Sequence, residues 1–328
     1  MKNNQTTWWR DVVERYERPH LPSSIGQIIN SVGPYLLLWA LMVWTIQYSY
    51  LLTLLLVIPA AGFWIRIFII CHDCGHGSFF VNRKANHVVG AITGLMTLTP
   101  YRYWRLEHAR HHGSSGNLDR RGIGDIWTMT VDEYRASSWW RRLGYRLYRN
   151  PLIMFGLGSF YLFAVRYRLT AGVQEPAARH SVYLTNAGLL VVGALLVAWL
   201  GLAHFLMIFV PLLFLASSAG VWLFYVQHQF EGVYWERDEK WDYLKQAMEG
   251  SSFYRLPRVL QWFTGNIGFH HIHHLSHRIP NYNLPRCHYE NALFQRVPHI
   301  TLRTSLRSLT FRLWDERQHR LVGFAAAR

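Results

Sequence analysis

Three short stretches of the sequence space histidines three or four residues apart. They read His72-Asp-Cys-Gly-His76, His108-Ala-Arg-His111-His112 and His270-His-Ile-His273-His274. Residues at this spacing share one face of a helix, and imidazole is the commonest metal ligand among side chains. The candidate ligands are His72, His76, His108, His111, His112, His270, His273 and His274. This set is too large for one tetrahedral zinc ion, so the sequence predicts two metal ions of higher coordination number.

His228 is a ninth candidate ligand because of its position. It follows a long apolar run, as His72 follows an earlier one, so both side chains are expected at the ends of membrane helices. His271 and His277 adjoin the third stretch and are candidates for residues that support the ligands. We expect the remaining histidines, which are isolated or lie at an outer turn, to be ordinary polar residues: His20, His87, His180, His204, His288, His299 and His319.

Carboxylates and thiols also stand near these histidines in the sequence. A metal-bound imidazole usually donates its second N–H to a carboxylate or a carbonyl. The acidic residues in reach are Asp73, Glu107, Asp119, Asp125 and Glu231, each either a ring-orienting group or a solvated surface charge. Cys71 and Cys74 form a C-x-x-C pattern, but Cys287 is the only other cysteine. We therefore expect packing residues there, and no disulfide framework.

Two hydrophobic hairpins are predicted to bring the histidines to one membrane surface. A membrane-spanning helix needs about 20 residues. The four predicted spans cover about 32–49, 51–71, 182–200 and 203–226. Arg66 lies near the end of the second span, where we expect it to reach the headgroups or to pair with a carboxylate. The apolar segments 88–98 and 151–165 are too short to span, so we expect them to be buried, re-entrant or interfacial.

The N-terminal region has a different pattern. Residues 1–10 contain no apolar core of a secretory signal, so we expect no cleaved signal peptide. Apolar positions between Trp8 and Tyr16 predict a short amphipathic helix. That helix either lies at the membrane surface or packs on the protein.

The distribution of basic residues predicts the orientation in the membrane. The chain of 328 residues carries a net charge of +15, and all 34 lysines and arginines except Arg66 lie in residues 1–30, 72–181 and 227–328. Positive charge marks the cytoplasmic side, so these segments and every candidate ligand are predicted to face the cytoplasm. We expect one all-α integral membrane domain over residues 1–328 of an inner-membrane protein, with a cytoplasmic helical cap. Topology and anionic lipid headgroups explain the charge, and no nucleic-acid-binding motif is visible.

The chemistry expected of such a site is oxidation of an apolar substrate. Neutral imidazoles suit iron, copper, zinc and nickel. Breaking an unactivated C–H bond requires a metal cofactor that reacts with oxygen, because acid–base residues cannot do it. A metal-binding or transport protein of the membrane is the alternative from another class. A transport protein would need ionisable groups deep within the spans. The only charged side chain in the predicted spans is Arg66, which lies near the end of one of them.

The three histidine stretches closely resemble the histidine boxes of the membrane fatty acid desaturases. The resemblance extends over about residues 35–290, and His228 in Tyr225-Val-Gln-His228 matches the additional histidine of that family. The flanking residues are similar to the Δ12/ω6 acyl-lipid branch: Gly77-Ser-Phe after the first box, Gly116-Asn-Leu-Asp-Arg-Arg-Gly122 after the second and Arg278-Ile-Pro-Asn-Tyr-Asn-Leu284 after the third. The resemblance implies four membrane helices under a cap that holds two irons.

The resemblance also implies a reaction and its partners. The expected reaction is O₂-dependent removal of two hydrogens from adjacent methylenes of an acyl chain, which is carried by a lipid, by coenzyme A or by acyl carrier protein. A separate donor, ferredoxin-like, is expected to supply two electrons, because the sequence has neither the haem motif of a fused cytochrome b5 domain nor a flavin or nicotinamide fingerprint. An acyl or alkane hydroxylase and an alkene-forming decarboxylase remain alternatives, since the boxes are shared among these reactions.

Overall fold

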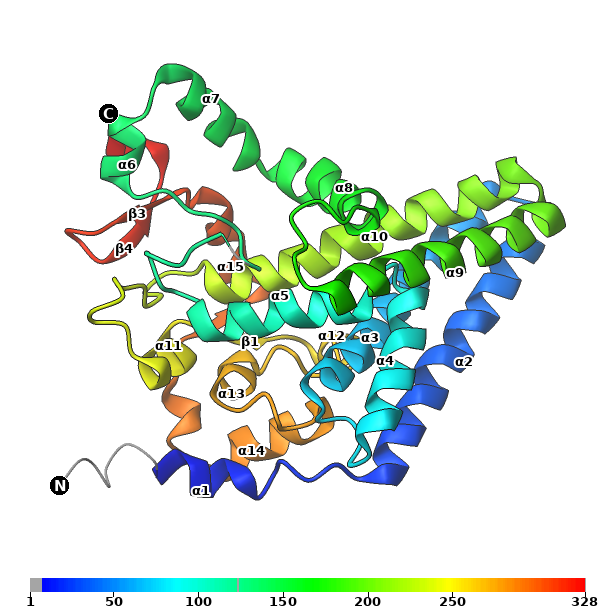
Figure 1. Cartoon of the computed structure of the whole chain (residues 1–328), viewed down its shortest axis with the longest axis horizontal. Coiled ribbons are helices and arrows are strands. Elements are labelled where there is room, and N and C mark those ends of the chain that lie inside the picture. The colour runs from blue at the N-terminus through cyan, green and yellow to red at the C-terminus, as the bar shows by residue number, and fades with distance from the viewer. Residues whose placement is uncertain (1–7, 123, 328) are drawn as a thin grey trace.

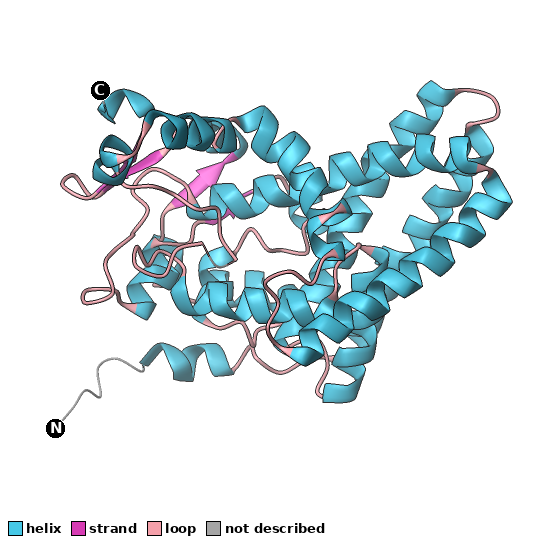
Figure 2. Ribbon diagram, turned by 45° about the horizontal axis from the view of Figure 1, so that its top comes forward, coloured by secondary structure: helices cyan, strands magenta, loops and turns pink. Residues whose placement is uncertain are grey.

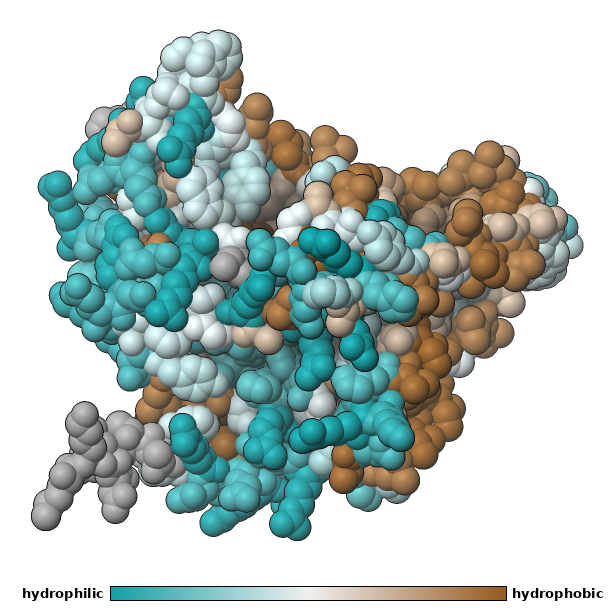
Figure 3. All heavy atoms as spheres, viewed as in Figure 1, coloured by the Kyte–Doolittle hydropathy of each residue, from teal (hydrophilic) through white to brown (hydrophobic). Residues whose placement is uncertain are grey.

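Four long helices dominate the computed structural model, which describes residues 8–122 and 124–327. They are α2 (Leu21–Thr45), α3 (Tyr50–His76), α9 (Pro176–Leu200) and α10 (Leu202–His228), and all four are long and apolar enough to cross a membrane. Figure 1 shows them extending together from the rest of the molecule, and Figure 3 shows hydrophobic atoms along this extension. The expectation of an all-α membrane fold with four spans is confirmed.

The helices are longer than the apolar runs that predicted them. The first begins at Leu21, not near residue 32, because its polar residues face protein: Ser24 and Gln27 are buried, and the Ser24 hydroxyl donates to the Phe79 carbonyl at 2.7 Å. The third begins at Pro176, a residue favoured in the first turn of a helix. Hydropathy alone does not detect helical turns whose polar groups are buried against a neighbouring segment of the protein.

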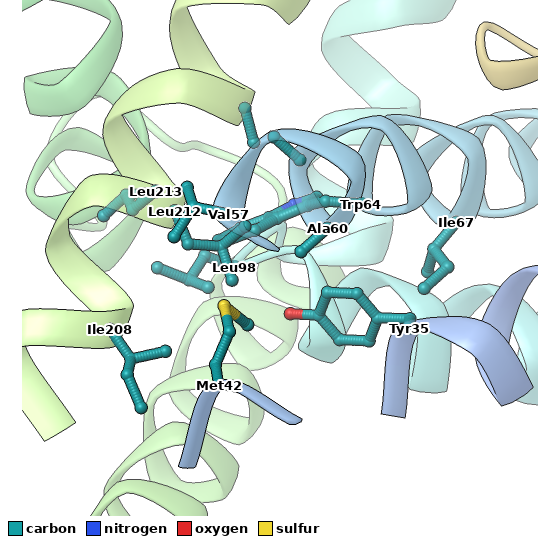
Figure 4. Close-up of a cluster of buried hydrophobic side chains, with 12 residues drawn as sticks. Tyr35, Met42, Val57, Ala60, Trp64, Ile67, Leu98, Ile208, Leu212 and Leu213 are labelled. Atoms are coloured by element: carbon teal, nitrogen blue, oxygen red, sulfur yellow. The ribbon is translucent and has the colours of Figure 1, made fainter. Parts of the chain in front are cut away.

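The centre of the bundle is a layer of interlocked apolar side chains (Figure 4). Met42 of α2, Val57 of α3 and Ile208 of α10 are almost fully buried there, and Trp64 is 4% exposed. At the predicted outer turns, the Ser49 hydroxyl accepts from the Leu52 amide at the start of α3, and Gly201, at φ 77°, joins α9 to α10. A left-handed φ of this kind favours glycine.

The remaining chain forms a cap of short elements at one end of the bundle (Figure 2). Its α-helices are α1 (Trp8–Glu14), α4 (Arg83–Met96), α5 (Tyr101–Ser114), α6 (Val131–Ala136), α7 (Trp139–Tyr148), α8 (Ser159–Ala164), α11 (Tyr243–Glu249), α12 (Arg258–Phe263), α13 (His270–Leu275), α14 (Leu284–Glu290) and α15 (Leu302–Ser305). A π-helix, η1 (Leu152–Gly158), precedes α8, and single 3₁₀ turns cover Arg166–Arg168, Asn281–Asn283, Phe294–Arg296, Leu306–Thr310 and Phe324–Ala327.

Two small sheets accompany these helices. The strands β1 (Phe253–Arg255) and β2 (His299–Thr301) pair in parallel, with Tyr254 opposite Ile300. The strands β3 (Leu313–Asp315) and β4 (Arg320–Val322) pair antiparallel. They are the only strands in the part of the chain that the structure describes, so the all-α description needs only this small addition.

The short apolar segments resolve as surface-packed helices. In α1, Trp9 and Val13 are buried against α13 and α14, which favours packing on the protein; residues 1–7 lie outside the described residues. The segment 88–98 forms most of α4, which packs on α3. The segment 151–165 forms η1 and α8, which pack on α10.

Arg66 behaves differently from both sequence-based expectations. It is only 6% exposed, and its guanidinium donates to the carbonyl of Trp262 and to the side-chain oxygen of Asn30. Its Cζ atom lies 3.9 Å from the Trp262 ring centre, within cation–π range. It therefore neither pairs with a carboxylate nor extends to solvent. The sequence could not reveal this partner, because α12 joins the second span only in three dimensions.

Candidate metal centre

Four helices deliver the nine predicted ligands to one place. The end of α3 supplies His72 and His76, and α10 ends at His228. The other six come from α5 and α13, and α5 lies between α13 and the end of α10 in Figure 1. The spacing of three or four residues puts the histidines of each helix on one face. The bundle thus fixes two helix ends that carry predicted ligands, and the histidines of the two cap helices contact those ends.

The nine histidines divide into two adjoining groups. The five-membered group consists of His72, His76, His108, His112 and His273, and the four-membered group consists of His111, His228, His270 and His274. Within each group, one ring nitrogen of every member lies within 4.8 Å of those of the others. The rings of His112 and His274 stack across the boundary, with centroids 4.3 Å apart. Two metal sites side by side are therefore geometrically possible.

The distances between ring nitrogens suit metal ligation. A bond of about 2.1 Å from metal to imidazole nitrogen puts neighbouring ligands at right angles about 3.0 Å apart. The Nε2 atom of His228 lies 3.1 Å from that of His111 and 2.9 Å from that of His270. The Nε2 atoms of His72 and His273 are 3.0 Å apart. These spacings match pairs of ligands at right angles to each other around one ion.

Unpartnered nitrogens give a second test of fit. His274 is 1% exposed, yet neither of its ring nitrogens has a hydrogen-bond partner, and the Nε2 atom of His76 has none either. A buried polar group without a partner costs about 1–3 kcal/mol. Coordination of a metal would remove that cost, so the residues present fit a metal-binding role.

The structure orients two of the rings through their other nitrogen. The Nδ1–H of His72 donates to Asp73 Oδ1 at 2.9 Å, and the Nδ1–H of His228 donates to the Gly250 carbonyl at 3.2 Å. Each bond leaves the lone pair on Nε2, the atom that faces the other histidines. Asp73 Oδ2 in turn accepts from the backbone and side-chain N–H groups of Asn281, at 2.7 and 2.8 Å. Asp73 therefore fixes the His72 ring.

Burial favours the neutral, metal-binding form of the imidazoles. The pKa values of His108, His112, His273 and His274 are all lowered well below the usual range. The main cause is burial, which disfavours the charged ring, and the neighbouring histidines add to it. The rings are consequently kept unprotonated at neutral pH.

The other predicted site residues have mixed outcomes. Asp73 orients the ring of the predicted ligand His72, whereas the remaining acids have other partners: Glu107 binds Arg110, Asp119 binds Arg237, Glu231 binds Arg307 and Asp125 accepts from the Gly122 amide. Cys71 and Cys74 are buried packing residues, as expected. His277 contacts the five-membered group, with its ring centre 4.9 Å from that of His76. His204 is exposed near the start of α10, at the other end of that helix from His228, and lies in neither histidine group.

Sequence reasoning missed two features of the site. His288 was expected to be isolated, but it is buried and its Nδ1 lies 3.0 Å from Nε2 of His271. His271 belongs to neither histidine group, and its ring pairs with that of His288. Asn281 was also missed. It begins the 3₁₀ turn that follows the third box, and this place in the sequence carries no local signal for contact with Asp73.

An apolar cavity of about 460 Å³ leads to the histidines. Leu213, Gly220 and Phe224 of α10 line the cavity, and so do His72, His108 and His270. The lining residues of α10 extend from Leu213 to Gln227, a length of about 21 Å at 1.5 Å per residue. Burial raises the pKa of Asp125, another lining residue, to about 6. The cavity suits a long hydrocarbon.

Comparison with known proteins identifies the class. The sequence model of the family described as "Fatty acid desaturase" matches residues 48–303. A "Fatty acid desaturase" of Bacillus subtilis (strain 168) is 48% identical over 96% of this chain and 89% of its own. The chain belongs to the fatty acid desaturase family and is an oxidoreductase of that family.

More distant relatives have more specific names. A protein of Synechocystis named "sn-1 acyl-lipid omega-3 desaturase (ferredoxin)" is 27% identical over 82% of this chain and 74% of its own. An "sn-1 oleoyl-lipid 12-desaturase" of the same organism is 28% identical over 67% of this chain and 63% of its own. These relatives differ from one another in the position of the double bond that their names give.

Proposed function

We propose that the two histidine groups each hold one iron ion and that the nine histidines are the ligands. The five-membered group around His72 and His273 binds one iron, and the four-membered group around His228 and His270 binds the other. Two observations support this assignment. The distances between ring nitrogens fit ligands at right angles around an ion, and neither ring nitrogen of His274 has a hydrogen-bond partner. When bound, the irons supply the activation of O₂ that family members need.

The substrate is the acyl chain of a membrane lipid. The cavity is lined mainly by apolar residues, runs beside α10, and ends at His72, His108 and His270, so a chain within it has its methylenes next to the proposed irons. Trp104 also lines the cavity and stacks on His108, with ring centres 4.5 Å apart. The acyl-lipid names of two relatives favour a lipid-bound chain over other acyl carriers.

The reaction converts two adjacent methylenes into a cis double bond. One O₂, two electrons and two protons enter, and two water molecules leave together with the unsaturated chain. The electrons come from a separate ferredoxin-like protein, which supplies them one at a time; the name of one relative includes ferredoxin. An acidic carrier suits the basic cap, which we place on the cytoplasmic side of the inner membrane. The residues that flank the boxes favour the Δ12/ω6 position.

The observation that carries this proposal is the apolar cavity that ends at two groups of histidines. The test is expression of the chain in a host that lacks desaturases, followed by gas chromatography–mass spectrometry of the fatty methyl esters. We expect a new mid-chain cis double bond. A mid-chain alcohol or a shortened terminal alkene would instead assign hydroxylation or decarboxylation and refute the proposal.

A further inference from the structure

An exposed apolar ridge runs along the helix α7 and continues onto η1. Trp139, Trp140, Leu143 and Leu147 of α7 are between 40% and 66% exposed, and Leu152 of η1 is 83% exposed. Figure 3 shows hydrophobic atoms at the surface between α7 and α8. Large exposed apolar patches mark interaction sites. Tryptophan and leucine on one face of a helix with arginines beside them are typical of a helix in the membrane interface.

The opposite side of α7 borders a groove of about 480 Å³. Arg141, Gly144 and Tyr148 of α7 form one wall, and the segment around Trp127 forms another. Two residues of this groove, Gly122 and Asp125, also line the acyl cavity. The groove and the cavity therefore border the same two residues, so we place the polar end of a molecule in the groove when its hydrocarbon fills the cavity.

The chemistry of the groove suits a phosphate group. Arg141 is exposed, and its Cζ atom lies 6.0 Å from the ring centre of Trp127, which supports the side chain from one side. The planar guanidinium recognises phosphate through two parallel hydrogen bonds. Asp125 is the one acid among the described residues that line the groove, and its Oδ1 accepts from the Gly122 amide at 2.8 Å.

We propose that this groove binds the phosphodiester headgroup of a membrane phospholipid through Arg141, while one acyl chain of the same lipid lies in the cavity. The exposed face of α7 then lies in the interfacial layer, and the groove opens beside the headgroups. This inference rests on the proposed function, because it takes the acyl cavity as the substrate site. It adds to that function the groove beside Arg141, which would select acyl chains that are bound to a phospholipid.

Two variants test the groove directly, each with a matched control. Arg141→Gln removes the guanidinium at the third position of α7, where glutamine is a favourable residue. Its control is Arg320→Gln, which changes an exposed arginine of strand β4. Gly144→Leu fills the groove, since an added Cβ there meets nothing within 4 Å. Its control is Gly193→Leu in α9, which also has open space around it.

The first measurement is binding of phosphatidylglycerol to the metal-free full-length chain in detergent, by native mass spectrometry. Loss of a charge-assisted hydrogen bond costs about 1.5–3 kcal/mol, or at least tenfold in affinity. We expect Arg141→Gln and Gly144→Leu to raise the Kd for this lipid about tenfold and both controls to match wild type. Unchanged binding in both groove variants would overturn the proposal.

The second measurement separates this inference from the proposed function. With iron-loaded protein and phospholipid in mixed micelles, we expect Arg141→Gln to raise KM about tenfold and to leave kcat and iron content unchanged. If wild type desaturates acyl-coenzyme A but no phospholipid, the groove proposal is wrong while the desaturase proposal stands. If no acyl substrate gains a double bond, the proposed function fails, and the binding measurement still decides the role of the groove.

Discussion

Replacing Asp73 by asparagine removes the group that orients His72. The carboxylate is 2% exposed and accepts three N–H groups: His72 Nδ1–H on one oxygen and two N–H groups of Asn281 on the other. An amide has only one oxygen, so it can accept on one side, and its NH₂ must face a donor on the other. Either His72 loses the acceptor that keeps its lone pair on Nε2, or Asn281 loses its partner.

The magnitude follows from the bonds that are lost. At least one charge-assisted hydrogen bond disappears, worth about 1.5–3 kcal/mol, and tenfold in affinity corresponds to about 1.4 kcal/mol. We therefore expect Asp73→Asn to weaken iron binding about 10- to 100-fold, the range typical of groups that orient metal ligands. The assay is iron retained by purified protein across a series of chelator concentrations.

The matched control is Asp119→Asn, which removes the same charge from a partly exposed ion pair with Arg237. Exposed pairs contribute about 0–1 kcal/mol, and this one does not touch the histidines. The control should retain iron as wild type does. If Asp73→Asn also stays within twofold of wild type, the argument that Asp73 orients a metal ligand is wrong.

Three further predictions concern a ligand, the cavity and the topology. His228→Ala should lower iron content and abolish desaturation, whereas His204→Ala, at the other end of α10, should match wild type; full iron and full activity in His228→Ala would remove it from the ligand set. Gly220→Phe should shift the products to shorter chains, because Gly220 lines the cavity and an added Cβ meets nothing within 4 Å; Gly193→Phe is its control, and an unchanged chain-length profile would contradict the substrate path. Cysteines introduced at Gln47 and Ala203 should react with an impermeant reagent in intact cells, and one at Gln318 should not. The native background should be low because all three native cysteines are buried; the reverse pattern would invert the proposed topology.

Most of the membrane fold was predictable because its signal is local. Long apolar runs, and the absence of lysine and arginine from the two turns between paired spans, locate the spans without tertiary information. The start of α2 was not predictable, since Ser24 and Gln27 are polar and only their neighbours in the fold make them buried. Arg66 is similar: its partner Trp262 is almost two hundred positions away, and no local pattern links the two residues.

The candidate site shows the same division between local and distant information. Histidine spacing predicted which residues converge, because helical periodicity puts each set on one face. The division into groups of five and four depends on how α5 and α13 cross, so His111 and His112, adjacent in sequence, fall into different groups. Asp73 was named as one of five possible orienting acids, but only the structure distinguishes it from Asp119, which binds Arg237 instead.

Metal analysis of variants in the two groups tests the central claim most directly. Iron per chain would be measured by plasma mass spectrometry on protein purified after loading with iron(II) without oxygen, for wild type, His273→Ala and His270→Ala. We predict close to two irons in wild type and about one in each variant, because His273 and His270 belong to different groups. A single zinc per chain in wild type, or two irons retained in both variants, would contradict the assignment of one iron to each histidine group.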